Sequence, residues 1–302
     1  EQLEQALTAA IDGRGSIWLI AGESGVGKSR LMEEIRIQGL VQGVTVLRGQ
    51  ALNKTRLPYQ IWRAIVRRLV LSTEISNKHA GILMEIIPDI ADLLKREIPA
   101  ATTLEGDAAR KRLVNAIVSL FAKQKKPILL LLEDLHWTKE SLEVVNLLNH
   151  HINSLPLMII GSFRDDDKPK LPEQLPGMQL IKLNRLSIDE IAELSESMLG
   201  NIGRKPEIID LIQRETEGNV FFVVEVVRVL IEEAGQPDNI GRITLPQQVF
   251  AGGIQQVIQH RLEQVINPAS HELLKLAATF GRYIDMHVMT AFTEQVGITL
   301  EA

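Results

Sequence analysis

The residues with the clearest chemistry lie in one glycine-rich segment near the start of the chain. Residues 22–29 read G-E-S-G-V-G-K-S, which matches the pattern G-x-x-x-x-G-K-[ST]. Glycines let backbone N–H groups turn toward an anion, and a helix that starts there adds partial positive charge. Lys28 can then reach the β- and γ-phosphates of a nucleotide, and the Ser29 hydroxyl can bind Mg²⁺. We therefore predict an ATP- or ADP-binding segment made of Gly22, Glu23, Ser24, Gly25, Val26, Gly27, Lys28, Ser29 and Arg30.

A pair of acids, Glu133 and Asp134, follows five consecutive aliphatic residues at positions 128–132. Ligands bind α/β sheets at the carboxyl ends of the strands, where this pair would lie. One acid at that edge can hold Mg²⁺, while a second orients or deprotonates the attacking water. By position, Glu133 would be the metal-side acid and Asp134 the water-side acid. The candidate ligands of Mg²⁺ are then Ser29, Glu133 and Asp134. The alternative is that two acids simply end a strand in solvent.

An arginine ends another apolar run. Arg164 follows residues 157–163, so we expect it at the tip of a strand next to the acid-bearing strand. There it could contact the γ-phosphate and report its loss. We therefore include Arg164 with Lys28, Glu133 and Asp134 among the predicted catalytic residues. The alternative is that Arg164 is a solvated arginine in a loop. We interpret residues 165–167, three aspartates, as a solvated acidic turn.

The elements that must position these residues alternate along the first part of the chain. Strands are expected at 17–21, 44–48, 128–134, 157–163 and 178–183, with helices between them. This alternation predicts an α/β fold with a parallel sheet. In the helix after residues 22–29, Leu31, Ile35 and Leu40 recur near helical spacing. Pro88 should interrupt a helical stretch at residues 82–95.

Two basic segments are given structural interpretations. Arg63, Arg67 and Arg68 lie away from the apolar stripe of a helix that Pro58 opens, and we interpret them as a solvated face. The helix at residues 108–125 ends in K-Q-K-K-P, where lysines suit the negative end of the helix dipole.

After residue 183 the strand signals stop. Ser187 and Glu190 form a capping box, and helices are expected at 188–199, 206–217, 219–234, 249–265 and 268–280. The change to helices alone marks a domain boundary near residue 185. The 302 residues carry a net charge of −5 and include no cysteine, which excludes disulfides and thiolate metal sites and argues against nonspecific DNA coating. No apolar run reaches the roughly 20 residues of a membrane-spanning helix, so we expect a cytoplasmic protein.

The segments G-E-S-G-V-G-K-S-R-L, L-L-L-L-E-D-L-H-W, I-I-G-S-F-R-D-D-D and E-G-N-V-F-F-V-V-E-V resemble those of STAND-class ATPases, the signal-transduction ATPases with numerous domains. The resemblance is strongest to the ATPase domains of bacterial multidomain regulators, among them transcription factors of the maltose-regulator and LuxR types, protein kinases and nucleotide cyclases. It implies a P-loop core at 1–185 with five parallel strands in the order 5-1-4-3-2, an all-α lid at 186–245 and an incomplete winged helix at 246–302.

The resemblance also assigns residues. It implies phosphate and Mg²⁺ roles for Lys28 and Ser29, metal and hydrolysis roles for Glu133 and Asp134, and a sensor role for Arg164. The lid motif G-N-P-F-F of the family places a proline near the adenine, where this chain has Val220. The Gly-Arg-Glu segment that helps to hold adenine in the family lies before residue 1.

The resemblance implies a slowly hydrolysing ATP/ADP switch that passes a conformation to output and sensor domains outside this chain. Nucleotide-dependent self-association would accompany it, without a membrane and without direct nucleic-acid binding by this chain. The main alternative is a nucleic-acid-loading ATPase related to origin-recognition proteins. A small-molecule kinase and a binding module that never hydrolyses nucleotide are the others.

Overall fold

The structure is a computed structural model that describes residues 1–51, 58–135 and 139–235, with residues 262, 273–275, 277–278, 289–290 and 293 beyond them. The chain divides into two compact units, Glu1–Arg185 and Leu186–Ala302. None of the described helices is both long and apolar enough to cross a membrane.

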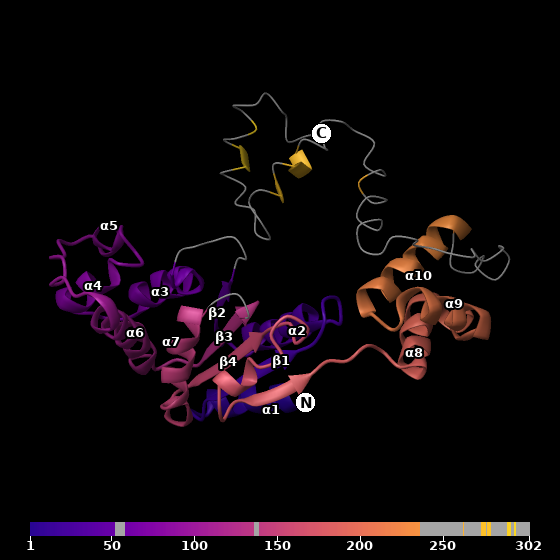
Figure 1. Cartoon of the computed structure of the whole chain (residues 1–302), viewed down its shortest axis with the longest axis horizontal. Coiled ribbons are helices and arrows are strands. Elements are labelled where there is room, and N and C mark those ends of the chain that lie inside the picture. Colours follow the sequence, from indigo (N-terminus) through magenta and orange to yellow (C-terminus); the bar gives the residue numbers. More distant parts are fainter. Residues whose placement is uncertain are drawn as a thin grey trace. The chain divides into compact units, whose positions relative to one another are not determined.

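A five-stranded sheet forms the centre of the first unit (Figure 1). Its strands are β1 (Ser16–Ala21), β2 (Thr45–Gln50), β3 (Ile128–Glu133), β4 (Leu157–Ser162) and β5 (Gln179–Lys182). All neighbours pair in parallel, in the order β2-β3-β4-β1-β5. This is the predicted order 5-1-4-3-2 counted from the other edge, so the predicted fold is confirmed.

Helices cover both faces of this sheet because successive strand residues point to opposite sides. Trp18, Leu131 and Ile160 belong to one core, which lies under α1 (Gln2–Ile11) and α2 (Lys28–Val41). Leu19, Leu130 and Ile159 belong to the other, shared with α3 (Gln60–Ser72), α6 (Gly106–Ala122) and α7 (Lys139–Asn149). Strands buried on both faces explain the unbroken aliphatic runs of the sequence.

Two short helices complete this second layer, and they differ from the expected stretch at 82–95. The first, α4 (Asn77–Leu83), starts earlier because the Ser76 hydroxyl accepts a hydrogen bond from the His79 N–H at 3.3 Å and caps it. The second is α5 (Ile90–Leu94), which follows Pro88. Single turns of 3₁₀ helix, η2 (Ile152–Ser154) and η3 (Pro172–Gln174), lie before β4 and β5.

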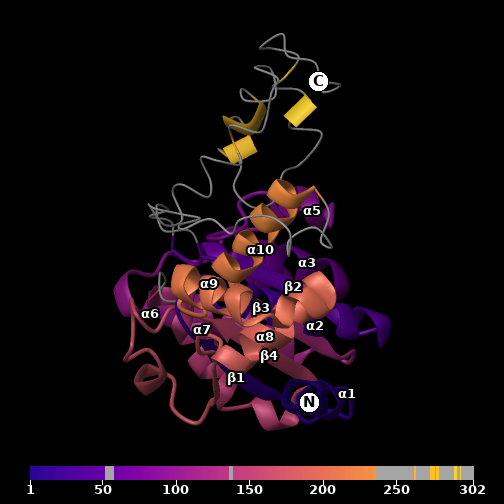
Figure 2. The ribbon, with the colours of Figure 1, turned by 90° about the vertical axis from the view of Figure 1, so that its right-hand side faces the viewer.

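The described part of the second unit is helical. It contains α8 (Ile188–Leu199), the 3₁₀ helix η4 (Gly200–Arg204), α9 (Pro206–Thr216) and α10 (Val220–Ala234). The three α-helices lie together in both Figure 1 and Figure 2, around buried Ile191, Ile212 and Val226. The predicted capping box is present at α8, with Ser187 as the N-cap. Apart from the isolated positions beyond residue 235 given above, the helices expected at 249–265 and 268–280 and the winged helix lie outside the described residues.

Candidate functional site

The glycine-rich segment forms a tight loop between the end of β1 and the start of α2. Gly22, Gly25 and Gly27 have φ values of 149°, 87° and 104°, which residues with a Cβ rarely adopt. At Gly22 a Cβ atom would also lie 2.5 Å from the Leu183 carbonyl oxygen. The loop therefore depends on glycine at this position for its backbone conformation and for the close approach of the chain that follows β5.

Helix α2 presents its amino end to this loop. Lys28 and Ser29 are its first two residues, and its N-cap, Gly27, supplies no side-chain hydrogen bond. The first N–H groups of a helix lack partners within the helix and carry partial positive charge. The glycine-rich loop and the start of α2 therefore offer backbone N–H donors and positive electrostatic potential to the same anion.

The Lys28 side chain folds back over the loop and is only 9% exposed. Its ammonium donates hydrogen bonds to the carbonyl oxygens of Gly22 at 2.7 Å and of Glu23 at 2.6 Å. Burial lowers the pKa of Lys28, the nearby Arg164 lowers it further, and Asp134 opposes the shift. Arg164 and Asp134 therefore both lie close enough to Lys28 to change its pKa.

Glu133, the last residue of β3, is held by an arginine that the sequence analysis missed. Arg48 on β2 donates from Nε to the Glu133 carboxylate at 2.5 Å and also pairs with it through a terminal nitrogen. Glu133 is 1% exposed, so its negative charge is balanced inside the protein by Arg48. A second carboxylate, Glu33 on α2, lies 3.8 Å from Arg48. No local sequence signal predicts this pairing, because it depends on how β2 and β3 align.

Asp134 leaves the strand in a different conformation and environment from Glu133. Its φ value is 59°, in the left-handed region, so the chain turns sharply after β3. Its N–H donates to the Ser162 hydroxyl at 3.3 Å, and the Gln50 amide lies 3.4 Å from its carboxylate. Of the two acids, Asp134 is the one that acts on the pKa of Lys28. The two adjacent acids thus have different partners: Glu133 pairs with Arg48, and Asp134 contacts Ser162 and Gln50.

The segment after β4 brings more charge to this edge than was expected. Besides Arg164, the carboxylates of Asp165 and Asp166 act on Lys28 and oppose the fall of its pKa. Asp165 also pairs with Lys182 of β5 at 3.1 Å, and its other carboxylate oxygen is buried without a hydrogen-bond partner. The interpretation of residues 165–167 as a solvated turn is therefore wrong for Asp165.

One ion pair connects the loop to the end of the first unit. The Glu23 carboxylate accepts hydrogen bonds from Arg185 Nε at 3.0 Å and from a terminal nitrogen of Arg185 at 2.8 Å. Arg185 is the last residue before the second unit. The same Glu23 supplies one of the carbonyl oxygens that hold Lys28. A path of direct contacts thus runs from the lysine to the segment that enters the helical unit.

The other predicted nucleotide-binding residues lie in three settings. Ser24 is exposed at the loop, Val26 is buried, and Arg30 is exposed and pairs with Glu34 one turn later. Val220 is the first residue of α10, in the second unit. Its proximity to adenine stays a prediction.

The residues present fit a nucleotide with Mg²⁺ better than a metal held by protein alone. Within the described ranges, no group of three or more histidine, aspartate or glutamate side chains could hold a metal ion. Mg²⁺ in nucleotide sites needs only one or two carboxylates, because phosphates and waters complete its shell. That Ser29, at the start of α2, and the two acids at positions 133 and 134 supply the oxygen ligands of such a site stays a prediction.

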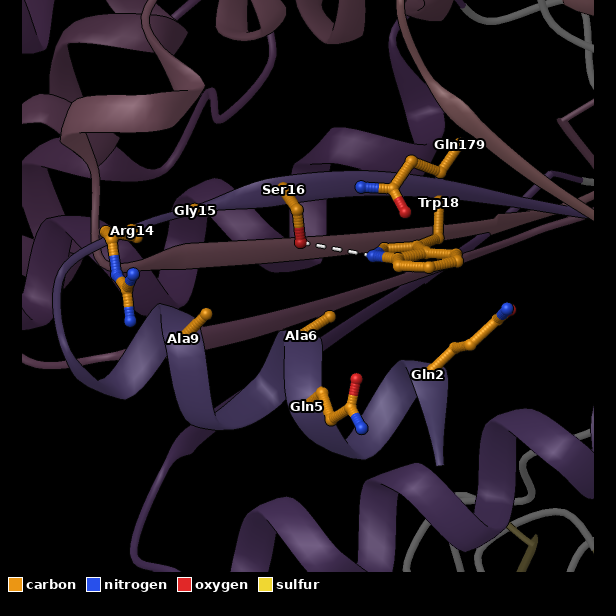
Figure 3. A pocket seen from close by; sticks show the side chains of 9 residues that line it. All are labelled: Gln2, Gln5, Ala6, Ala9, Arg14, Gly15, Ser16, Trp18 and Gln179. Carbon is orange, nitrogen blue, oxygen red and sulfur yellow. Dashed lines mark hydrogen bonds between the residues drawn. The ribbon is translucent and has the colours of Figure 1, made fainter.

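A separate cavity lies between α1 and the β1–β5 edge, as Figure 3 shows. It measures about 430 Å³, and Gln2, Gln5, Arg14, Trp18 and Gln179 are among its lining residues. The Trp18 indole N–H donates to the Ser16 hydroxyl at 3.1 Å and fixes the ring. None of the predicted site residues lines this cavity.

Comparison of the sequence with models of protein families shows which family this chain belongs to. The model described as AAA ATPase domain matches residues 1–160, more than half of the chain. The chain belongs to the AAA ATPase domain family. The match to the AAA ATPase domain includes the glycine-rich loop and both acids, Glu133 and Asp134, but ends before Arg164 and Val220. A search of curated protein sequences gave no match.

Several solved structures of AAA-type proteins are similar to this chain. ORC1 from Aeropyrum pernix, solved in complex with DNA, has 14% identity and a TM-score of 0.47, covering 97% of this chain and 75% of that one. AMPPCP-bound DnaA from Aquifex aeolicus has 15% identity and a TM-score of 0.43, covering 90% and 68%. A point mutant of RuvB from Thermotoga maritima has 10% identity and a TM-score of 0.42, covering 99% and 81%. At these identities and scores the similarities carry no argument about function.

Proposed function

We propose that this AAA ATPase domain protein is a STAND-class regulatory switch that binds ATP with Mg²⁺, hydrolyses it slowly and adopts different conformations with ATP and ADP. The observation that supports the proposal is the strand order: the glycine-rich loop, Asp134 and Arg164 follow the neighbouring parallel strands β1, β3 and β4 at the carboxyl edge of the sheet. Ligands of α/β sheets bind at this edge.

Binding would use groups that already face the loop. The loop N–H groups and the start of α2 would accept the phosphates, while Lys28 exchanges its two carbonyl acceptors for phosphate oxygens. Ser29 would bind Mg²⁺, and Glu133 at the end of β3 would complete the protein's share of its ligands. When bound, ATP with Mg²⁺ supplies an electrophilic γ-phosphoryl group.

Hydrolysis would use Asp134 to orient and deprotonate the attacking water, because Arg48 pairs with Glu133 and the Asp134 carboxylate contacts the Gln50 amide instead. Arg164 would stabilise charge on the transferred group and report its loss. Glu133 would act on the metal side, in competition with its pairing to Arg48. That competition supports a slow reaction, since a carboxylate neutralised by arginine attracts Mg²⁺ less strongly than a free one.

The conformational output would pass through the contacts at Arg185. A phosphate that draws Lys28 away from the Glu23 carbonyl oxygen would change the backbone that Arg185 holds. The second unit starts at the next residue, so its arrangement would differ between ATP and ADP. Output and sensor domains outside this chain, or another copy of it, would detect that difference.

Phosphate release tests the proposal. We expect Asp134→Asn to bind ATP as the wild type does but to release phosphate about 100-fold more slowly, because it lacks the water-side base. Asp210→Asn on the exposed side of α9 is the matched control and should keep the wild-type rate. Equal rates for all three proteins would contradict the role of Asp134. A wild type that binds ATP without any turnover would instead favour a pure binding module.

A further inference from the structure

A second cavity lies at the opposite edge of the sheet from the glycine-rich loop. It measures about 540 Å³ and includes Thr45, the first residue of β2. The carboxyl ends of α3 and α6 border it, since α3 ends at Ser72 and α6 at Ala122. These helices contact each other on the same face of the sheet (Figure 1). The cavity thus belongs to the first unit and lies apart from the proposed ATP site.

The lining of this cavity is strongly basic. Arg68, Lys123, Lys125 and Lys126 line it, against one acid, Glu74. In the described parts of the chain, none of these four cations forms an ion pair with a carboxylate. Lys123 donates only to the Glu74 backbone carbonyl, at 3.4 Å. Three positive charges are therefore in excess here, in a chain whose net charge is −5.

Helix dipoles explain only part of this excess. Lysines at the ends of helices are favourable because each carboxyl end carries about half a negative charge. The ends of α3 and α6 together offset about one of the three charges. Lys125 and Lys126 also lie beyond Lys123, the C-cap of α6, and the dipole effect is confined to the last turn. About two positive charges remain for another partner.

The cavity has the form of a small-ligand site. Leu47 and Leu69, each 2% exposed, line it together with the basic residues. The Gln124 amide donates to the Thr73 hydroxyl, which joins the ends of the two helices. The volume falls in the range of about 300–1,000 Å³ typical of small-molecule pockets. A duplex or a protein surface would instead require an open, extended face.

We propose that this basic cavity binds a small molecule with two or more phosphate groups, at a site distinct from that of ATP. Arginine and lysine side chains are the usual ligands of phosphate oxygens, and a concave site with four of them favours polyphosphates over single phosphates. The site does not depend on the glycine-rich loop, so it is independent of the proposed switch.

Calorimetry with inorganic tripolyphosphate tests this proposal. The whole chain is used with Lys28→Ala, which removes the lysine of the glycine-rich loop, in buffer with physiological salt. We expect one tripolyphosphate to bind this variant. Adding Lys125→Ala and Lys126→Ala should weaken binding by about tenfold or more, since two charge-assisted contacts are lost. The matched control adds Lys78→Ala and Lys111→Ala, two exposed lysines elsewhere, and should bind as the Lys28→Ala variant does.

Three outcomes would overturn the proposal. In the first, the Lys28→Ala variant binds no tripolyphosphate. In the second, both pairs of lysine substitutions weaken binding equally, which would indicate only general charge attraction. In the third, a duplex oligonucleotide binds through Lys125 and Lys126 while tripolyphosphate does not, which would assign the surface to nucleic acid. Thermal melting of each variant shows that it is folded.

Discussion

At the scale of single residues, the main feature is a buried ion pair that involves Glu133, a residue of the proposed ATP site. Glu133 is buried and Arg48 is its direct partner. A buried pair contributes little net stability, but removal of one partner leaves an uncompensated charge in the interior. Arg48 therefore lowers the free-energy cost of burying the Glu133 carboxylate. It also makes that carboxylate less available to a cation such as Mg²⁺.

This pairing gives a prediction for stability. Arg48→Met should lower the free energy of unfolding of the first unit by about 3 kcal/mol, because the buried Glu133 carboxylate then loses its arginine partner. The double variant Arg48→Met with Glu133→Gln should recover most of the loss. Urea unfolding followed by tryptophan fluorescence measures this, since all three tryptophans lie before residue 186. Arg36→Met, which removes a half-exposed pair with Glu33, is the control and should cost much less.

The same residues show what the sequence could and could not predict. Spacing located the loop and the strand ends, because glycine patterns and aliphatic runs are local signals. The Arg48–Glu133 pair is invisible locally, since it requires the register in which Gln50 pairs with Glu133 across β2 and β3. Asp165 was misjudged for a related reason: its pairing with Lys182 depends on how the chain returns to β5.

At the scale of elements, the sequence predicted the strands well and the helix surfaces less well. The stripe Leu31, Ile35 and Leu40 suggested the inner face of α2, but Leu40 is 50% exposed. Gly39 is buried instead, and a Cβ there would lie 3.1 Å from Leu129 Cδ2. Close packing of a helix on a strand selects a small residue, and hydrophobic periodicity does not report this.

The capping box of α8 gives a prediction at this scale. Hydrogen bonds from the backbone N–H and the hydroxyl of Ser187 lower the pKa of Glu190 below its ordinary value of 4.5. Its ionised form therefore stabilises the helix above pH 4.5, and this contribution is lost as the pH falls through the lowered pKa. At pH 7, Glu190→Ala should speed hydrogen exchange in the first turns of α8. The difference from wild type should shrink at acidic pH.

The control for this experiment is Glu193→Ala, an exposed acid one turn further along α8. It lacks a cap interaction and should leave exchange at the start of the helix nearly unchanged. Equal protection of wild type and Glu190→Ala at neutral pH would mean that the capping box does not stabilise α8.

At the scale of the whole molecule, the proposed switch requires communication between the nucleotide site and the second unit. Arg185→Ala should leave ATP affinity within about threefold of wild type, because it removes no phosphate contact, yet abolish the difference in small-angle scattering between ATP and ADP states. Arg214→Ala, an exposed arginine on α9, is the control and should preserve that difference. Preservation of the difference in Arg185→Ala would rule out the Glu23–Arg185 contact as the route.

The most direct test of the central claim is calorimetric titration of the protein with ATP and Mg²⁺. We expect wild type and Lys111→Ala to bind ATP at the glycine-rich loop with equal affinity. Lys28→Ala should bind it about tenfold more weakly or worse, because its loop has lost the ammonium that contacts the phosphates. Equal binding by all three proteins, or no binding by the wild type, would contradict the claim that this loop encloses a nucleotide.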